Sequence, residues 1–118
     1  MTERAAVPER EFQATVVELL EVCGWSWFHI FPLRTKHGWR TGTTSKGIPD
    51  LICLRGPDVI AIEVKSDQGR PKPEQIAWLN RFADLDSGHA WVISPDVDFQ
   101  TLSRWLAHPR LAPVRHGY

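Results

Sequence analysis

The stretch that decides the fold runs from Gly47 to Lys65 and reads GIPDLICLRGPDVIAIEVK. It contains two apolar runs, Leu51–Leu54 and Val59–Val64, with the residues Arg-Gly-Pro-Asp at positions 55–58 between them. Aliphatic and β-branched runs on either side of turn-forming residues predict a β-hairpin. Both runs are too apolar for surface strands, so we expect the hairpin to lie inside a larger sheet.

Charged residues occur where the two strands would meet at one end. Side chains alternate between faces along a strand, so Glu63 and Lys65 share a face with Ala61, and Ile62 faces the other way. In an antiparallel hairpin, Asp50 at the start of one strand is expected beside Glu63 and Lys65 at the end of the other. Two carboxylates form an oxygen site suited to Mg²⁺ or Mn²⁺, and a neighbouring lysine can hold a water or stabilise a phosphorane-like transition state. The alternative is a turn aspartate beside a weak surface ion pair.

The motifs Gly47-Ile48-Pro49-Asp50-Leu51 and Ile62-Glu63-Val64-Lys65 resemble those of the PD-(D/E)xK nuclease superfamily. More closely, the sequence is similar to the VRR-NUC family of virus-type replication and repair nucleases, whose pattern continues in Gly69-Arg70, Gln75 and Trp78-Leu79. The resemblance extends over about residues 9–105. The combined pattern is more specific than any one of its parts.

This resemblance implies a Mg²⁺- or Mn²⁺-dependent DNA endonuclease that hydrolyses phosphodiester bonds. Asp50 and Glu63 would hold the metal, with the carbonyl of Val64 as a possible further ligand. Lys65 would position the attacking water or stabilise the developing charge, and Gln75 would hold Lys65 in place. The family also suggests branched DNA, such as a junction or flap, as the substrate in replication, recombination or repair.

The first helix is expected from about Pro8 to Cys23. Helical spacing gives it one apolar stripe, made of Phe12, Val16, Leu19, Leu20 and Cys23. Glu9 is either a first-turn acid favoured by the helix dipole or a third acid that approaches the metal. The family carries a glutamate near the start of this helix, which favours the second interpretation. The assignment of that glutamate to Glu9 rather than Glu11 stays open.

An aromatic strand is expected over Trp25–Leu33, with Trp25, Trp27 and Phe31 on one face and in the core. A long polar loop, Arg34–Lys46, follows it and leads toward the acid cluster. Long loops within small domains are either functional or solvated and without a partner, and the position of this one favours function. The residues expected to contact DNA phosphates are Arg34, Lys36, Arg40, Thr43, Lys46 and Arg70.

The rest of the chain alternates helix and strand. A second helix is expected from Pro73, with Trp78, Leu79 and Phe82 on its buried face. A short strand over residues 90–93 and a last helix over residues 99–106 follow, the latter with Leu102, Trp105 and Leu106 directed inward. The order helix, three strands, helix, strand, helix is that of an α/β/α sandwich with a mixed central sheet.

Length and composition bound these expectations. The 118 residues suit a single domain over 1–118, with irregular ends at 1–8 and 109–118. Two cysteines, Cys23 and Cys53, lie in apolar stretches and read as reduced core residues of a cytoplasmic protein without a structural zinc site. No apolar run approaches the length of a membrane span.

The formal net charge is zero, which counts against DNA binding driven by bulk charge. Positions 22–49 nevertheless hold Arg and Lys without any Asp or Glu, so a local basic face is expected. A chain this small would grip branched DNA as a homodimer with two active sites. The other hypotheses are a restriction-like or nicking nuclease on ordinary duplex, and a non-catalytic DNA-binding module.

Overall fold

The computed structural model describes residues 9–29, 32–35, 38–41, 46–65 and 70–112 of the chain. Its elements are, in chain order, α1 (Glu9–Val22), β1 (Ser26–His29), β2 (Pro32–Thr35), β3 (Gly38–Thr41), β4 (Leu51–Arg55), β5 (Asp58–Val64), α2 (Pro73–Ala83), β6 (Gly88–Ile93), α3 (Phe99–Ala107) and the 3-10 turn η1 (Pro109–Leu111). The predicted order of helices and strands is confirmed, with the strand pair β2 and β3 inserted between β1 and β4.

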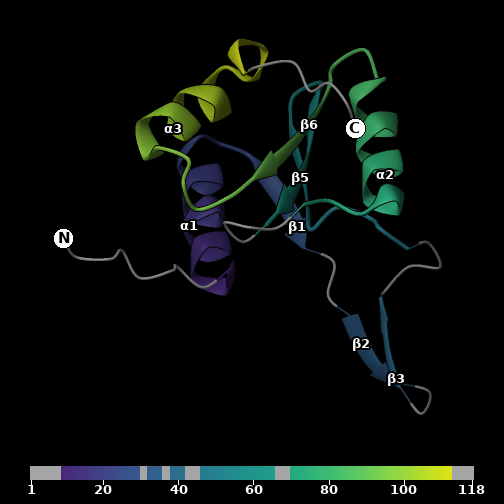
Figure 1. Cartoon of the computed structure of the whole chain (residues 1–118). Helices are drawn as coiled ribbons and strands as arrows, with labels where there is room; N and C mark the ends of the chain where they lie inside the picture. The colour runs from purple at the N-terminus through teal and green to yellow at the C-terminus, as the bar shows by residue number, and fades with distance from the viewer. Residues whose placement is uncertain (1–8, 30–31, 36–37, 42–45, 66–69, 113–118) are drawn as a thin grey trace.

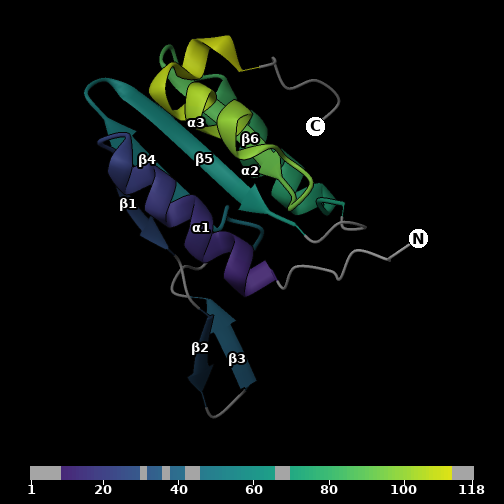
Figure 2. The same ribbon diagram turned by 90° about the vertical axis from the view of Figure 1, so that its left-hand side faces the viewer.

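Four strands form one mixed sheet in the order β1-β4-β5-β6. β4 pairs in antiparallel direction with both β1 and β5, and β6 pairs in parallel direction with β5. A parallel neighbour requires a crossover, which α2 provides between β5 and β6. α2 lies on one face of the sheet, while α1 and α3 lie on the other (Figure 1, Figure 2). The fold is therefore the predicted α/β/α sandwich, of the restriction-endonuclease-like type.

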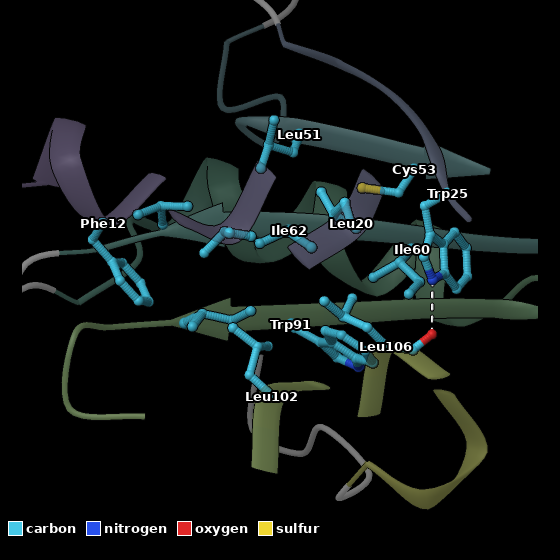
Figure 3. Packing of buried hydrophobic residues seen from close by; sticks show 13 residues of the cluster. Phe12, Leu20, Trp25, Leu51, Cys53, Ile60, Ile62, Trp91, Leu102 and Leu106 are labelled. Atoms are coloured by element: carbon cyan, nitrogen blue, oxygen red, sulfur yellow. Dashed lines mark hydrogen bonds between the residues drawn. The ribbon is translucent and has the colours of Figure 1, made fainter. Parts of the chain in front are cut away.

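The larger hydrophobic core lies between the sheet and the helices α1 and α3 (Figure 3). Strand β5 gives it Ile60, Ile62 and Val64, the face that alternation predicts. The stripe predicted for α1 also enters this core, with Phe12, Val16 and Leu20 buried and Leu19 and Cys23 partly buried. Helical and strand periodicities in the sequence thus identify the residues that hold these elements together.

Trp25 joins the start of the sheet to the last helix. The ring is buried, and its indole Nε1 donates a hydrogen bond to the carbonyl of Leu106 at 2.7 Å (Figure 3). A buried indole N–H requires such a partner. Helix α3 faces the core with Leu102 and Leu106 buried and Trp105 half-buried, as predicted.

A smaller core lies on the other face, under α2. Its buried members are Ile52, Ala61, Leu79 and Ala90. Leu79 is the buried residue of α2, and the neighbouring Phe82 packs at the border of the cluster. This face is the one that also carries Glu63, because Glu63 has the same parity as Ala61 along β5.

The first strand differs from the prediction. A single strand was expected over Trp25–Leu33, but β1 covers only Ser26–His29, and Pro32 and Leu33 belong to β2. Proline has no backbone N–H to donate to a sheet, so it is a poor member of a continuous strand. Sequence alone did not reveal that this aromatic run serves two different sheets.

The expected aromatic core is only partly present. Trp25 is buried, but Trp27 is 36% exposed because β1 is an edge strand of the sheet. The third ring, Phe31, lies outside the described residues. Placing all three rings in the core was therefore wrong for Trp27.

The polar loop predicted over Arg34–Lys46 is largely a β-hairpin. β2 and β3 form a separate two-stranded antiparallel sheet, in which Leu33 pairs with Arg40 and Arg34 with Trp39. The hairpin extends away from the four-stranded sheet (Figure 1, Figure 2).

Helix α1 ends in the ordinary way. Gly24 follows α1 with φ +81°, the left-handed conformation in which glycine commonly terminates a helix. The segment predicted as irregular from position 109 begins with the 3-10 turn η1, in which Pro109 is buried. None of the described helices is long and apolar enough to cross a membrane.

Candidate active site

Asp50 immediately precedes β4 and is held against the end of β5. Its Oδ2 accepts a hydrogen bond from the backbone N–H of Val64 at 2.8 Å. The β4–β5 register pairs Leu51 with Ile62, and one further step brings Asp50 opposite Glu63. The hairpin therefore places the two carboxyl groups side by side at one end of the sheet.

Glu63 is buried, with a residue exposure of 3%. Its Oε1 accepts a hydrogen bond from Gln75 Nε2 at 3.0 Å and lies 3.5 Å from Lys65 Nζ. Its Oε2 is buried and has no hydrogen-bond partner among the described residues. Because Glu63 is buried, it does not form a solvent-exposed ion pair with Lys65. The alternative interpretation, a weak surface ion pair, is therefore wrong.

The environment of Glu63 disfavours its charged form. Its pKa is raised to about 8, chiefly because the carboxyl is buried and next because the charge of Asp50 lies beside it. Lys65 opposes the shift but does not cancel it. A group that removed the repulsion between the two carboxylates would stabilise both in the charged form.

Gln75 reaches Glu63 from the first turn of α2. Its Oε1 accepts a hydrogen bond from the backbone N–H of Lys72 at 2.7 Å, which caps the helix and fixes the amide. Its Nε2 therefore points at Glu63. The sequence-based hypothesis had Gln75 hold Lys65, but the amide donates to Glu63 Oε1, the same oxygen that Lys65 faces.

Gly47 begins the motif that contains Asp50, but its sequence position alone predicted no role for it. Its φ is +83°, and its backbone lies against that of Glu74 and Gln75 at the start of α2. Two residues later, Pro49 is fully buried. A glycine before a buried proline and an acid was the sequence signal for a tight approach to another element.

Two glutamates, Glu9 and Glu11, are candidates for the third acid of the metal site. Glu9 begins α1, and its side chain lies outside the described part of the structure, while Glu11 is exposed. Both belong to a helix on the opposite face of the sheet from α2. The position of Glu9 at the start of the helix remains a prediction about the metal site.

The residues predicted to bind DNA precede Asp50 or follow Lys65 in the sequence. Lys46 and Arg70 are exposed, Arg34 lies in β2 and Arg40 in β3. Lys36 and Thr43 fall outside the described residues. Lys46 directly precedes Gly47, and the backbone contact of Gly47 places this part of the chain beside the first turn of α2.

The acid pair has the chemistry of a divalent-metal site. Among the residues that the structure describes, no group of three or more His, Cys, Asp or Glu side chains could hold an ion. Two carboxylates are present, however, and one of them keeps a buried oxygen without a partner. Mg²⁺ is commonly held by one or two carboxylates together with water and substrate phosphate, so these residues fit such an ion.

Comparison with protein families gives one finding. The family model described as the VRR-NUC domain matches residues 10–92, from α1 into β6. The match includes Asp50, Glu63, Lys65 and Gln75, and it begins one residue after Glu9. No curated protein matches the chain.

Proposed function

The chain belongs to the VRR-NUC family, and we propose that it is a Mg²⁺- or Mn²⁺-dependent DNA endonuclease with a preference for branched DNA. Membership makes it a nuclease of the PD-(D/E)xK type, a hydrolase that acts on DNA. The proposal concerns its metal, its catalytic residues and its substrate structure. Junctions and flaps that arise in replication, recombination or repair are the substrates we propose.

The observation that carries the proposal is that Oε2 of Glu63 is buried beside the carboxyl group of Asp50 and accepts no hydrogen bond from any residue that the structure describes. A buried acceptor without a hydrogen bond destabilises a folded protein by about 1–3 kcal/mol. Adjacent carboxylates add charge repulsion to that cost. A site that retains both features is organised for an additional positive group rather than for its own stability.

Asp50 and Glu63 are the proposed metal ligands, with the Val64 carbonyl and Glu9 as further candidates. The N–H of Val64 donates to Asp50 Oδ2, which keeps that carboxylate turned toward the end of β5. A divalent ion bound there would supply a Lewis acid and a lowered pKa for water. Gln75 contributes by orienting Glu63, since its own amide is fixed by the helix cap.

Lys65 has the proposed catalytic role nearest to the phosphate. Its ammonium lies 3.5 Å from Glu63 Oε1 and its side chain is 17% exposed, so it is both held by the site and accessible. From that position it can hydrogen-bond an attacking water or stabilise the charge that develops on phosphate oxygens. Both roles act mainly in the transition state.

We propose that DNA phosphates are contacted by residues that precede Asp50 and follow Lys65 in the sequence: Arg34, Lys36, Arg40, Thr43, Lys46 and Arg70. Because the net charge of the chain is zero, affinity for phosphates has to come from such a local group. Charge removal at Arg40 or Lys46 is expected to lower the log–log salt slope of binding by about one unit per lost contact. Arg104→Gln, an exposed change on α3 across the sheet, is the matched control.

A homodimer is the proposed active form, and the β1 edge is the proposed interface. α2 covers β5 and β6, whereas Phe28 and Leu54 on the same face remain 50% and 45% exposed. β1 has no neighbour on its outer side within the described sheet. An apolar edge strand can pair with its copy about a two-fold axis and bury both side chains.

Sedimentation tests the interface. Phe28→Asp is expected to convert a dimer into monomers, because it places a charge beside Leu54 on the exposed apolar surface of the proposed interface. Val22→Asp is the control, since Val22 is 83% exposed but lies at the end of α1. A monomeric parent chain, or an unchanged dimer in Phe28→Asp, contradicts this part of the proposal.

Cleavage of labelled linear, flap and four-way DNA tests the function itself. We expect cutting that requires Mg²⁺ or Mn²⁺, stops with EDTA, favours branched substrates and is lost in Asp50→Ala while the protein stays folded. Preference for linear duplex would assign a restriction-like or nicking activity instead. DNA binding without cutting under every metal condition would mean a non-catalytic module.

A further inference from the structure

Gly47 lies in the loop that leads into Asp50, and its backbone contacts the first turn of α2. A β-carbon at this position would lie 2.6 Å from the carbonyl carbon and 2.7 Å from the carbonyl oxygen of Glu74. It would also lie 2.8 Å from the backbone nitrogen of Gln75. These are helix backbone atoms, so they cannot yield by rotating a side chain. The missing side chain of Gly47 therefore sets the distance between this loop and α2.

The contact connects the segment that carries Asp50 with the helix whose Gln75 binds Glu63. On one side, Asp50 follows Gly47 by three residues, through the fully buried Pro49. On the other side, Gln75 carries the amide that donates to Glu63 Oε1 at 3.0 Å. A displacement of the loop from α2 would alter the position of Asp50, of Gln75 or of both.

We propose that Gly47 is a positioning residue for the metal site: its contact with α2 holds Gln75 against Glu63 and holds Asp50 at the end of β5. This inference rests on the proposed function, because it concerns the affinity of the same acid pair for a divalent ion. Loss of a group that orients a metal ligand typically weakens metal binding by about 10- to 100-fold. We expect a loss of that size in Gly47→Ala.

The chain offers a matched control for the backbone effect of this substitution. Gly24 has φ +81°, close to the +83° of Gly47, so alanine at either position meets the same conformational penalty. A β-carbon at Gly24 would have only the Arg55 side chain nearby, at 4.0 Å. Gly24→Ala therefore imposes the strain without the contact and lies at the end of α1, away from the acid pair.

The experiment measures Mn²⁺ affinity by calorimetry and thermal unfolding in EDTA. The variants are Gly47→Ala, Gly24→Ala, Gln75→Leu and the double variant Gly47→Ala/Gln75→Leu. Both glycine variants are expected to unfold at lower temperature than the parent chain, but only Gly47→Ala loses Mn²⁺ affinity. In the double variant, the loss should be smaller than the sum of the two single losses, because both changes break the link between Gln75 and Glu63, and any loss beyond that of Gln75→Leu measures the displacement of Asp50.

Equal Mn²⁺ affinities in Gly47→Ala and Gly24→Ala would overturn the inference. Either neither variant would have lost affinity, or backbone strain alone would explain the loss in both. Parent-like affinity in Gln75→Leu would also overturn it, and that result does not depend on Gly47→Ala folding. Fully additive losses in the double variant contradict the proposed route through Gln75. If the unaltered chain binds no Mn²⁺, the proposed function itself fails, and the inference fails with it.

Discussion

The β4–β5 hairpin carries charged residues at both of its ends, and the comparison begins at the turn. There, Arg55 donates hydrogen bonds to the carbonyls of Cys23 at 3.0 Å and Ala107 at 2.7 Å. Its guanidinium also lies 4.6 Å from the centre of the Trp25 ring. This arginine thereby joins the ends of α1 and α3 to the sheet.

The other end of the same hairpin is arranged differently. Glu63 is buried beside Asp50, keeps one oxygen without a partner among the described residues, and has a raised pKa. The guanidinium of Arg55 donates hydrogen bonds to backbone carbonyls, whereas one carboxyl oxygen of Glu63 accepts no hydrogen bond from the described residues. The contrast teaches that a charged residue at a strand end does not identify a site, whereas a buried acid with an unsatisfied oxygen and a raised pKa does.

The largest expected difference between the two ends is in catalysis. Lys65→Ala should lower the single-turnover rate of cleavage by roughly 10²–10³-fold, with nearly normal DNA and metal binding, because its role is confined to the transition state. Arg104→Ala, an exposed change across the sheet, should cut at the parent rate. A rate for Lys65→Ala within a few-fold of the parent chain would falsify its catalytic assignment.

The next largest effect should be on stability, and at the turn end. Arg55→Ala leaves two backbone carbonyls without their donor and removes the contact with Trp25, so the free energy of unfolding should fall by about 2–4 kcal/mol. Urea unfolding measures this loss. Cleavage per folded molecule should stay unchanged. A stable Arg55→Ala variant that cuts slowly would erase the distinction between the two ends.

A smaller effect on stability should appear at the end of the hairpin that carries Asp50 and Glu63, when no metal is bound. The pKa of Glu63 is about 8 in the folded protein, whereas in the unfolded chain it is the ordinary value of 4.5. The folded state therefore binds more protons across this window, and this contribution to stability decreases as pH rises through it. Glu63→Gln removes the dependence and should stabilise the metal-free protein by at least about 1 kcal/mol at pH 8.

Urea unfolding in EDTA between pH 4.5 and 8 measures this effect. Asp58→Asn, at the turn end, is the control that removes a carboxylate without touching the acid pair. A parallel pH dependence in the parent chain and in Glu63→Gln would mean that Glu63 ionises normally. It would also weaken the contrast with Arg55.

The smallest effect should come from the contact between His89 and Asp58 at the turn end. His89 Nε2 lies 3.5 Å from Asp58 Oδ1, and both side chains are partly exposed. Such pairs contribute about 0–1 kcal/mol, so His89→Gln should change the free energy of unfolding by no more than that. A loss above about 2 kcal/mol would show that this pair, like Arg55, helps to hold the sheet.

The parts of the fold that were predictable from sequence are those set by local patterns. The apolar runs of β4 and β5 and the turn at 55–58 specify one hairpin, and that hairpin alone brings Asp50 next to Glu63. The stripe of α1 similarly identified its buried face. In both cases, neighbouring positions along the chain contain the whole signal.

The parts that were missed depend on distant segments. Trp27 is exposed because β1 lies at the edge of the sheet, and strand order is not written in the aromatic run itself. Gln75 contacts Glu63 rather than Lys65 because of the placement of α2 over the sheet. The same placement gives Gly47 its contact, which no local pattern could reveal.

The unequal size of the two cores has a consequence for how the molecule opens. α1 and α3 share an extensive apolar interface with the sheet, whereas α2 is held mainly by the small cluster around Leu79. Segments with few buried apolar contacts detach at lower free energy than the rest of a domain. Release of α2 would withdraw Gln75 from Glu63 and leave the larger core intact. The contact between Gln75 and Glu63 would thus break and re-form by a local fluctuation, without global unfolding.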